Sequence, residues 1–303
     1  MNPLEVARHL LPFTRYRYDG EAVPCPVCGC DGCTPVAGLD RRLKRLSTVM
    51  CDRCGLLRTN PMPSAEELDR YYERYYRLDY QGAVSAPRAR HLRKRTDEAS
   101  ECSGWLRSRI PAGGRTLDFG AGSGELVSAM LDAGFDAHGF EPGTAFAAYA
   151  RESLGERIQV SGWRDVNFAG EFDLVTCMSV LEHLNTPVEA LQAMVAWLKP
   201  GGQVFIMVPD MEHHAQKGFG ALHFAHVVGF NHHNLQYAAG RVGLRMIDMV
   251  NPTRLLFERG PAPDMAELAR LGLATARAAY VDRSPVAAYF DYQLGKAGLS
   301  RKA

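Results

Sequence analysis

The sequence has no long hydrophobic run and almost no net charge. Its 303 residues include 46% apolar residues, with 35 basic and 34 acidic side chains. No apolar run approaches the roughly 18 residues that cross a bilayer, and the opening MNPLEVARHLLPFTRYRYDG has no long hydrophobic centre or small-residue cleavage site. We therefore expect a cytoplasmic protein without a membrane partner. The apolar content excludes a disordered or fibrous chain and predicts one substantial core with a smaller unit beside it.

Cysteine is scarce outside one short stretch, which holds six of the eight cysteines. Two Cys-x-x-Cys-Gly segments lie there, and each can form a tight knuckle that directs two thiolates at one point. The predicted ligands of a structural zinc ion are Cys25, Cys28, Cys51 and Cys54. Four thiolates leave such an ion no open position for catalysis. Cys30 and Cys33 offer an alternative cluster with the first knuckle, and free or redox-active thiols are a further interpretation.

A helix is predicted to begin at Ser64, because Glu67 three residues later completes a capping box. This helix carries Tyr71, Tyr72 and Tyr75, which either pack in a core or form part of a substrate lid. A basic segment, residues 88–95, opens a further helix that runs to about residue 109. We expect a solvated helix face there, with phosphate recognition as the alternative.

From residue 115 onward, short apolar strands alternate with amphipathic helices, as a parallel sheet with crossover helices requires. The predicted strands are residues 116–119, 137–140, 157–160, 174–178 and 204–208. The helices between them are residues 125–133, 145–153 and 188–198. A helix at 235–242, strands at 245–250 and 254–258, and a helix at 264–280 follow. The pattern predicts a doubly wound α/β sheet.

The most informative motif is LDFGAGSG, in which an apolar strand ends in Asp118 and three alternating glycines precede a helix. The third glycine comes one position too early for a dinucleotide loop. Asp118 would repel a diphosphate and attract a cationic amino group. Glu141 ends the next strand about 20 residues later, where a carboxylate suits a ribose diol. A ligand with an ammonium group and a ribose is implied, and S-adenosylmethionine has both and lacks phosphate.

Four motifs, LDFGAGSG, GFEP, FDLVTCMSVLEHL and LKPGGQVFIMVP, follow one another between about residues 114 and 258. With them the sequence resembles the class I S-adenosylmethionine-dependent methyltransferases, which implies a Rossmann-like sheet. The implied contacts are Asp118, Gly120 and Gly122 around the methionine part, Glu141 on the ribose, Pro142 and Trp163 beside adenine, and Cys177 and Met178 beneath the sulfonium. A core position is the alternative for Trp163.

The front end, CPVCG followed by CDRCGLLRTNPMPSAEELDRYY, resembles the zinc-knuckle leader of methyltransferases from bacterial sugar and natural-product pathways. In those proteins the leader and the next helices cover the substrate cleft. The implied units are a zinc-binding module at 1–62, a helical linker or lid at 63–113, a methyltransferase domain at 114–260 and a helical extension at 261–303. The implied partner is a small-molecule acceptor, commonly a nucleotide-linked sugar or a glycan.

The histidines complete the predicted site. Sugar C-methyltransferases usually show His-Glu-His where this chain has Phe224, Ala225 and His226, and loss of the carboxylate favours O-methylation. A hydroxyl acceptor must lose its proton, which an imidazole can take at neutral pH. His226 is the first candidate base and His183 the second, unless His183 is a structural residue. We expect solvent exposure, rather than a second metal site, for a further group: His213, His214, His223, His232 and His233.

Two other functions compete with a small-molecule methyltransferase. An RNA methyltransferase could use the zinc module to grip nucleic acid, but residues 1–113 carry 19 basic and 14 acidic side chains and lack a dense basic surface with interleaved aromatic residues. We therefore expect no nucleic-acid partner. A non-catalytic scaffold could keep the cofactor fold without turnover. The intact glycine loop, Asp118 and Glu141 argue against a dead site.

Overall fold

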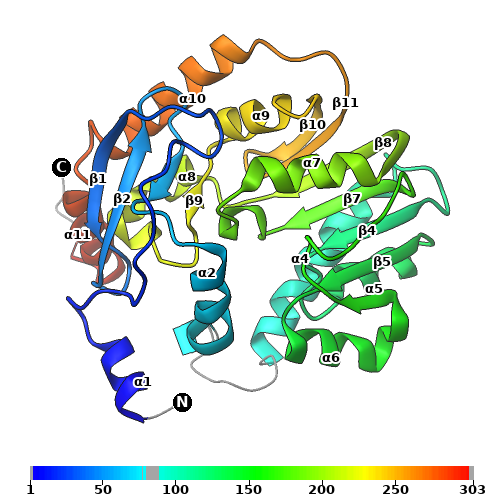
Figure 1. The fold of residues 1–303 in the computed structure, drawn as a ribbon, viewed down its shortest axis with the longest axis horizontal. Coiled ribbons are helices and arrows are strands. Elements are labelled where there is room, and N and C mark those ends of the chain that lie inside the picture. Colours follow the sequence, from blue (N-terminus) through cyan, green and yellow to red (C-terminus); the bar gives the residue numbers. More distant parts are fainter. Residues whose placement is uncertain (1–2, 77, 80–88, 300–303) are drawn as a thin grey trace.

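The computed structural model describes residues 3–76, 78–79 and 89–299. Its larger sheet has seven strands in the order β10-β11-β8-β7-β4-β5-β6 (Figure 1). The strands are β4 (Arg115–Phe119), β5 (Asp136–Glu141), β6 (Ile158–Val160), β7 (Phe172–Met178), β8 (Leu198–Met207), β10 (Leu244–Asn251) and β11 (Arg254–Arg259). Strands β6, β5, β4, β7 and β8 are parallel, and β11 is antiparallel to both of its neighbours. The predicted doubly wound α/β sheet is confirmed.

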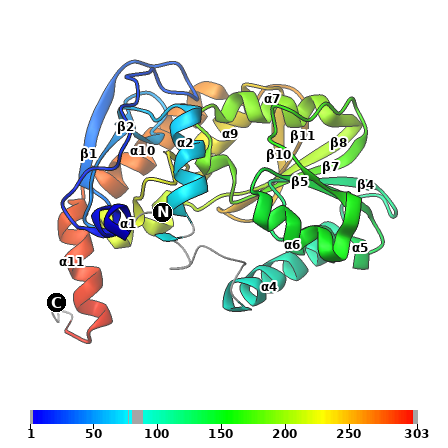
Figure 2. The same ribbon diagram turned by 60° about the horizontal axis from the view of Figure 1, so that its bottom comes forward.

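Helices cover both faces of this sheet because successive strand residues point to opposite sides. In β7, Leu174 and Met178 pack in one core cluster, whereas Val175 and Cys177 pack in another. The helices of the first face are α4 (Ala89–Leu106), α5 (Glu125–Asp132) and α6 (Thr144–Leu154). Those of the second face are α7 (Pro187–Trp197) and α9 (His232–Gly240). Figure 2 shows the two layers on either side of the strands.

The strand order reverses between β4 and β7. From β4 the chain proceeds outward to β5 and β6, whereas β7 and β8 lie on its other side. Ligands of open α/β sheets bind outside the carboxyl ends of the strands at such a reversal. The predicted glycine loop follows β4 at this point, so the topology places it at the expected ligand-binding edge.

A smaller antiparallel sheet, in the order β1-β2-β3-β9, contains most of the amino-terminal segment. Its strands are β1 (Cys33–Leu39), β2 (Arg45–Cys51), β3 (Leu57–Thr59) and β9 (Val228–Gly229). We predicted none of these strands, because their short runs mix polar and apolar residues. Strand β9 pairs with Leu57 and Arg58, and the amide of Thr59 donates to the carbonyl oxygen of Val227 over 2.9 Å. This pairing ties the segment that follows His226 to the amino-terminal sheet.

The helix predicted at Ser64 is present as α2 (Ala65–Tyr71), with the expected capping box between Ser64 and Glu67. A π-helical turn, η1 (Tyr72–Tyr76), continues it. The next predicted helix begins, within the described residues, at Ala89, and its predicted start at residue 88 lies outside them. Helix α2 and η1 thus connect the smaller sheet with the residues that lead to the larger one.

The carboxyl-terminal part contains the predicted helix α10 (Met265–Tyr280) and a further helix, α11 (Pro285–Lys296), which lies within the expected helical extension but whose bounds we did not predict. Helix α11 packs on η4 (Ala215–Ala221), where the rings of Phe219 and Tyr289 stack 4.1 Å apart. Two shorter helices are α1 (Pro3–Leu10) and α8 (Met211–His214). Among the described residues, none of the helices combines the length and apolar character needed to cross a membrane.

Candidate functional site

The glycine loop between β4 and α5 adopts backbone conformations that favour glycine. Gly120 and Gly122 have φ angles of 75° and 56°. A Cβ atom on Gly120 would lie 2.7 Å from a methyl carbon of Val180, whereas one on Gly122 would meet no heavy atom within 4 Å. Gly120 therefore permits close packing with the residues after β7, and Gly122 leaves open space in front of the loop.

The two predicted acidic residues lie at the carboxyl ends of adjacent parallel strands. Glu141 accepts hydrogen bonds from the amides of Gly122 at 3.0 Å and Gly143 at 2.7 Å, which hold its carboxylate beside the loop. Asp118 is buried and accepts a hydrogen bond of 2.8 Å from the hydroxyl of Thr176. Burial raises the pKa of Asp118 to about 7, although the Thr176 hydrogen bond and the charge of Arg95 oppose the shift.

The other predicted cofactor contacts differ in how exposed their side chains are. Pro142 is exposed beside Glu141. Trp163 is half-buried, and its ring centre lies 6.2 Å from that of Phe119. Met178 is buried at the end of β7, and the fully buried thiol of Cys177 packs in the core. Cys177 can therefore line a ligand site only through its backbone.

Arg95 belongs to this region, although we expected its segment to be a solvated face. Its side chain is 31% exposed, against 75% for the neighbouring Lys94, and its guanidinium lies 3.0 Å from a carboxylate oxygen of Glu98. The positive charge of Arg95 lowers the pKa of Asp118 and of Glu182 against the stronger effect of burial. On α4, Arg95 precedes the buried Ala99 by one helical turn, a spacing that could have revealed its inward position.

The two candidate bases converge on an acidic residue that we had not assigned. Glu182 and His183 lie in η3 (Leu181–His183), directly after β7, and His226 lies just before β9. The Nε2 atoms of His183 and His226 are each 3.8 Å from the same oxygen of Glu182. Nδ1 of His183 is 2.8 Å from the carbonyl oxygen of Ala225. Glu182 thus places a buried carboxyl group beside both candidate bases.

Burial controls the protonation of this cluster. It raises the pKa of Glu182 to about 8 and lowers that of His183 to about 4, although the carbonyls of Ala225 and Ser179 favour the protonated ring. Burial and the charge of His183 lower the pKa of His226 well below its usual value. Both imidazoles are therefore neutral at neutral pH and retain a nitrogen lone pair.

The tyrosines of the predicted lid divide between the core and the site. Tyr71 is buried, with its ring centre 4.9 Å from that of Phe224. The rings of Tyr72 and Tyr76 meet the ring of His183 edge to face, with centres 5.8 and 6.0 Å apart. Tyr75 stacks on the ring of His9, with ring centres 4.2 Å apart. Core packing is confirmed for Tyr71, whereas a substrate lid stays a prediction.

The expected solvent exposure of the other histidines is wrong for four of the five. Only His213 is exposed, whereas His214, His232 and His233 are half-buried. His223 is buried, and its ring centre lies 3.7 Å from that of His226. Leu222 and Phe224 on either side of His223 are buried too, so His223 belongs to a buried segment that the histidine spacing alone did not reveal.

Four cysteine thiols converge in the amino-terminal module. The sulfur atoms of Cys25, Cys28, Cys51 and Cys54 all lie within 4.8 Å of one another. The sulfur atoms of Cys25 and Cys54 lie 3.7 Å apart, and those of Cys28 and Cys51 lie 3.4 Å apart. Each knuckle closes with a glycine amide that donates to the carbonyl of the first cysteine, over 2.8 Å for Gly29 and 3.0 Å for Gly55. The two segments therefore form matching turns.

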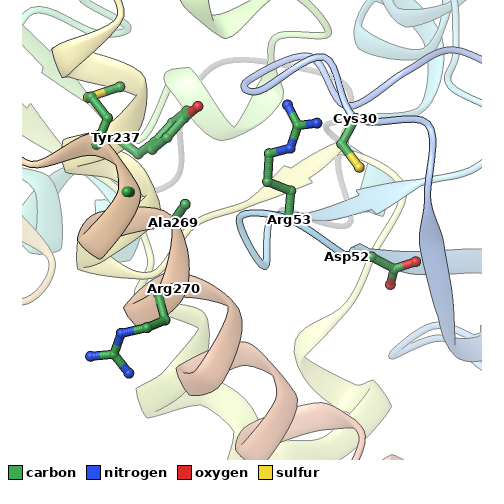
Figure 3. A pocket seen from close by; sticks show the side chains of 8 residues that line it. Cys30, Asp52, Arg53, Tyr237, Ala269 and Arg270 are labelled. Carbon is green, nitrogen blue, oxygen red and sulfur yellow. The ribbon is translucent and has the colours of Figure 1, made fainter.

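Cys30 and Cys33 do not belong to this group of thiols. Cys30 lines an open surface hollow together with Asp52, Arg53 and Tyr237 (Figure 3). Arg270 of α10 borders the same hollow. The hollow lies apart from the glycine loop, so it adds nothing to the site at the edge of the larger sheet.

Comparisons with known proteins agree with this geometry. A family model described as a methyltransferase domain matches residues 85–248, more than half of the chain. The ubiquinone biosynthesis O-methyltransferase of Pseudomonas paraeruginosa is 36% identical over 110 residues, which cover 34% of this chain and 47% of that protein. The chain thus spans about half the length of the curated relatives it matches.

Two solved structures share the fold. Magnesium protoporphyrin IX methyltransferase from Synechocystis has a TM-score of 0.50 and 14% identity, over 65% of this chain and 100% of that one. The 1,6-didemethyltoxoflavin-N1-methyltransferase of Burkholderia thailandensis has a TM-score of 0.50 and 15% identity, over 70% of this chain and 93% of that one. These similarities concern the fold.

Proposed function

Because this chain belongs to the methyltransferase domain family, we propose that it transfers a methyl group from S-adenosylmethionine to a hydroxyl of a small-molecule acceptor. The observation that carries the proposal is the position of Asp118 and Glu141 at the ends of adjacent strands, beside the open space at Gly122. This arrangement offers an anionic site without a phosphate-binding loop, as a cofactor with an ammonium group and a ribose requires.

In the proposed complex, Glu141 accepts hydrogen bonds from the ribose hydroxyls and Asp118 attracts the amino group of the methionine part. Arg95, which lies near enough to affect the pKa of Asp118, is suited to the methionine carboxylate. When bound, the cofactor supplies a methyl group on a positively charged sulfur, so that alignment with the acceptor provides much of the acceleration. The backbone at residues 177–178 and the side chains of Pro142 and Trp163 border the remaining part of this site.

The acceptor side of the site contains His183, His226 and the rings of Tyr72 and Tyr76. The neutral imidazole of His226 has a lone pair that can take the hydroxyl proton. The matched relatives are named O-methyltransferases, which supports oxygen as the acceptor atom. The resemblance of the cysteine-containing leader to those of sugar-pathway enzymes supports a carbohydrate-linked acceptor, and the tyrosine rings can pack on the apolar face of a sugar.

We also propose that Cys25, Cys28, Cys51 and Cys54 bind a structural zinc ion. Zinc–sulfur bonds of about 2.3 Å place tetrahedral sulfur ligands about 3.8 Å apart, close to the 3.4 and 3.7 Å separations of the thiols. A disulfide would need about 2.05 Å. Such an ion would stabilise the small sheet that holds the segment after His226 through β9.

Calorimetric titration of the full chain with S-adenosylhomocysteine tests the cofactor site. We expect micromolar binding that Glu141→Gln weakens at least about tenfold, because the uncharged amide is a poorer acceptor for the ribose hydroxyls. Glu171→Gln is the matched control, since Glu171 pairs with Arg115 at the opposite end of β4. Absence of binding by the folded wild-type chain would overturn the proposed function.

The acceptor class requires a separate assay with labelled methyl donor. Nucleotide-linked sugars, glycans and structured RNA are incubated with the full chain, and the labelled product is identified. Label on a sugar oxygen supports the proposal. Transfer to RNA alone would favour the nucleic-acid alternative instead.

A further inference from the structure

We propose that Glu182, His183 and His226 bind a divalent first-row transition metal ion beside the acceptor. This inference rests on the proposed function for the identity of the acceptor, whereas the metal site itself rests on the geometry of the three side chains. Their ligand atoms lie within 4.8 Å of one another. Two imidazoles and one carboxylate are a common ligand set for zinc and for ferrous iron.

The distances suit a shared ion better than direct hydrogen bonds. Both histidine Nε2 atoms are 3.8 Å from the same Glu182 oxygen, which is too far for a hydrogen bond. Two atoms bound to one ion by bonds of about 2.1 Å lie roughly 3 to 4 Å apart. The three donors therefore surround a point that an ion can reach with small side-chain shifts.

The carboxylate of Glu182 supplies an independent observation. Its side chain is only 2% exposed, and neither oxygen has a hydrogen-bond partner among the described residues. Buried polar groups nearly always have a partner, because an unsatisfied one loses its interactions with water without replacement. A cation between Glu182 and the two imidazoles would supply the missing partner.

The orientation of His183 agrees with metal binding. The 2.8 Å contact between Nδ1 and the carbonyl oxygen of Ala225 requires the proton on Nδ1, because a carbonyl only accepts. Nε2 then carries the lone pair and faces Glu182. Metal-binding histidines usually donate their other ring N–H to a carbonyl or carboxylate in this way.

Three protein ligands leave positions on the ion for an acceptor oxygen. A metal-bound hydroxyl loses its proton more readily, and that proton is released to water. The oxygen then forms a bond to the methyl carbon while the carbon–sulfur bond breaks and its electron pair stays on sulfur. The products are the methyl ether and S-adenosylhomocysteine. In this form of the site the ion replaces His226 as the group that promotes proton loss.

Metal content after equilibrium dialysis of the full chain against micromolar Zn²⁺ tests the proposal. We expect the wild-type chain to hold one equivalent more than Glu182→Gln or His226→Ala, with zinc affinity at this site weakened more than about 100-fold. His213→Ala is the control for adventitious binding, because His213 is exposed and remote from Glu182 in the sequence. Equal zinc content in the wild-type chain and both site variants would overturn the proposal.

Two further measurements make the outcomes distinct. Circular dichroism establishes that the variants are folded. His183→Asn is a milder third variant, because asparagine can keep a donor near the Ala225 carbonyl. It should also lose the extra equivalent of zinc. Titration of the same samples with S-adenosylhomocysteine tests the proposed function separately. Cofactor binding without the extra zinc equivalent would refute only the metal site, and the extra equivalent without cofactor binding would refute only the proposed function.

Discussion

The cysteine centre and the site at the edge of the larger sheet are built in opposite ways. The four thiols come from two short segments of the same pattern, each closed by its own glycine turn. The other site combines the ends of β4, β5 and β7 with His226, which β9 anchors to the smaller sheet. A centre made of local repeats is saturated by its own ligands, whereas a site assembled from distant elements can leave space for other molecules.

The largest expected effect is on protein stability, and it follows from the loss of one cysteine from the four-thiol centre. Cys51→Ser removes one of the four proposed zinc ligands. Because structural zinc binding is coupled to folding, we expect the free energy of unfolding to fall by more than about 5 kcal/mol. Zinc content and chemical denaturation measure the effect. Cys30→Ser is the control, since its sulfur lies outside the four-thiol group. An equal loss in both variants would contradict the assignment of ligands.

In the site at the edge of the larger sheet, a single substitution should weaken ligand binding without unfolding the protein. Asp118→Asn keeps the size of the side chain and removes its charge, so we expect the affinity for S-adenosylhomocysteine to fall about 100-fold, the equivalent of ~2.7 kcal/mol. Asp136→Asn is the same change at the amino end of β5 and should leave the affinity unchanged. Calorimetric titration distinguishes them, and unchanged binding in Asp118→Asn would remove Asp118 from the site.

The pH dependence of ligand binding should also differ between the wild-type chain and Asp118→Asn. Burial raises the pKa of Asp118 from its usual value of 3.8 to about 7, so the carboxyl is neutral below that pH and negative above it. A ligand ammonium group prefers the negative form. We therefore expect the affinity for S-adenosylhomocysteine to decrease as the pH falls below 7, with a limiting slope of about tenfold per unit. Asp118→Asn should show no such slope in the same titrations, and equal slopes would exclude this origin.

The smallest expected effect is the loss of ligand affinity on removal of the partly exposed Arg95. Arg95→Ala should weaken binding of S-adenosylhomocysteine about fivefold, since a partly exposed ion pair contributes about 1 kcal/mol. Lys94→Ala removes the adjacent, more exposed charge and should have no effect. Titrations at low and high salt check the electrostatic origin, because the difference between the variants should shrink as salt increases. A salt-independent loss would indicate a packing role.

The larger sheet could be predicted closely because its strands are apolar runs separated by amphipathic helices, as in the segment from β4 to α5. The glycine loop and Glu141 followed from local motifs. Strands β1 to β3 could not be predicted, since their short mixed sequences depend on pairing with one another. The burial of His223 and the convergence of Glu182 with His226 also escaped prediction, because both depend on the pairing of β9 with β3.

A crystal structure of the full chain with S-adenosylhomocysteine tests the central claim most directly, namely that the carboxyl edge of β4, β5 and β7 is the methyl-transfer site. We predict the ribose hydroxyls within hydrogen-bond distance of Glu141, the amino group beside Asp118, and the sulfur on the side of the site that holds His226. A ligand bound elsewhere, such as in the surface hollow near Cys30, would contradict the account.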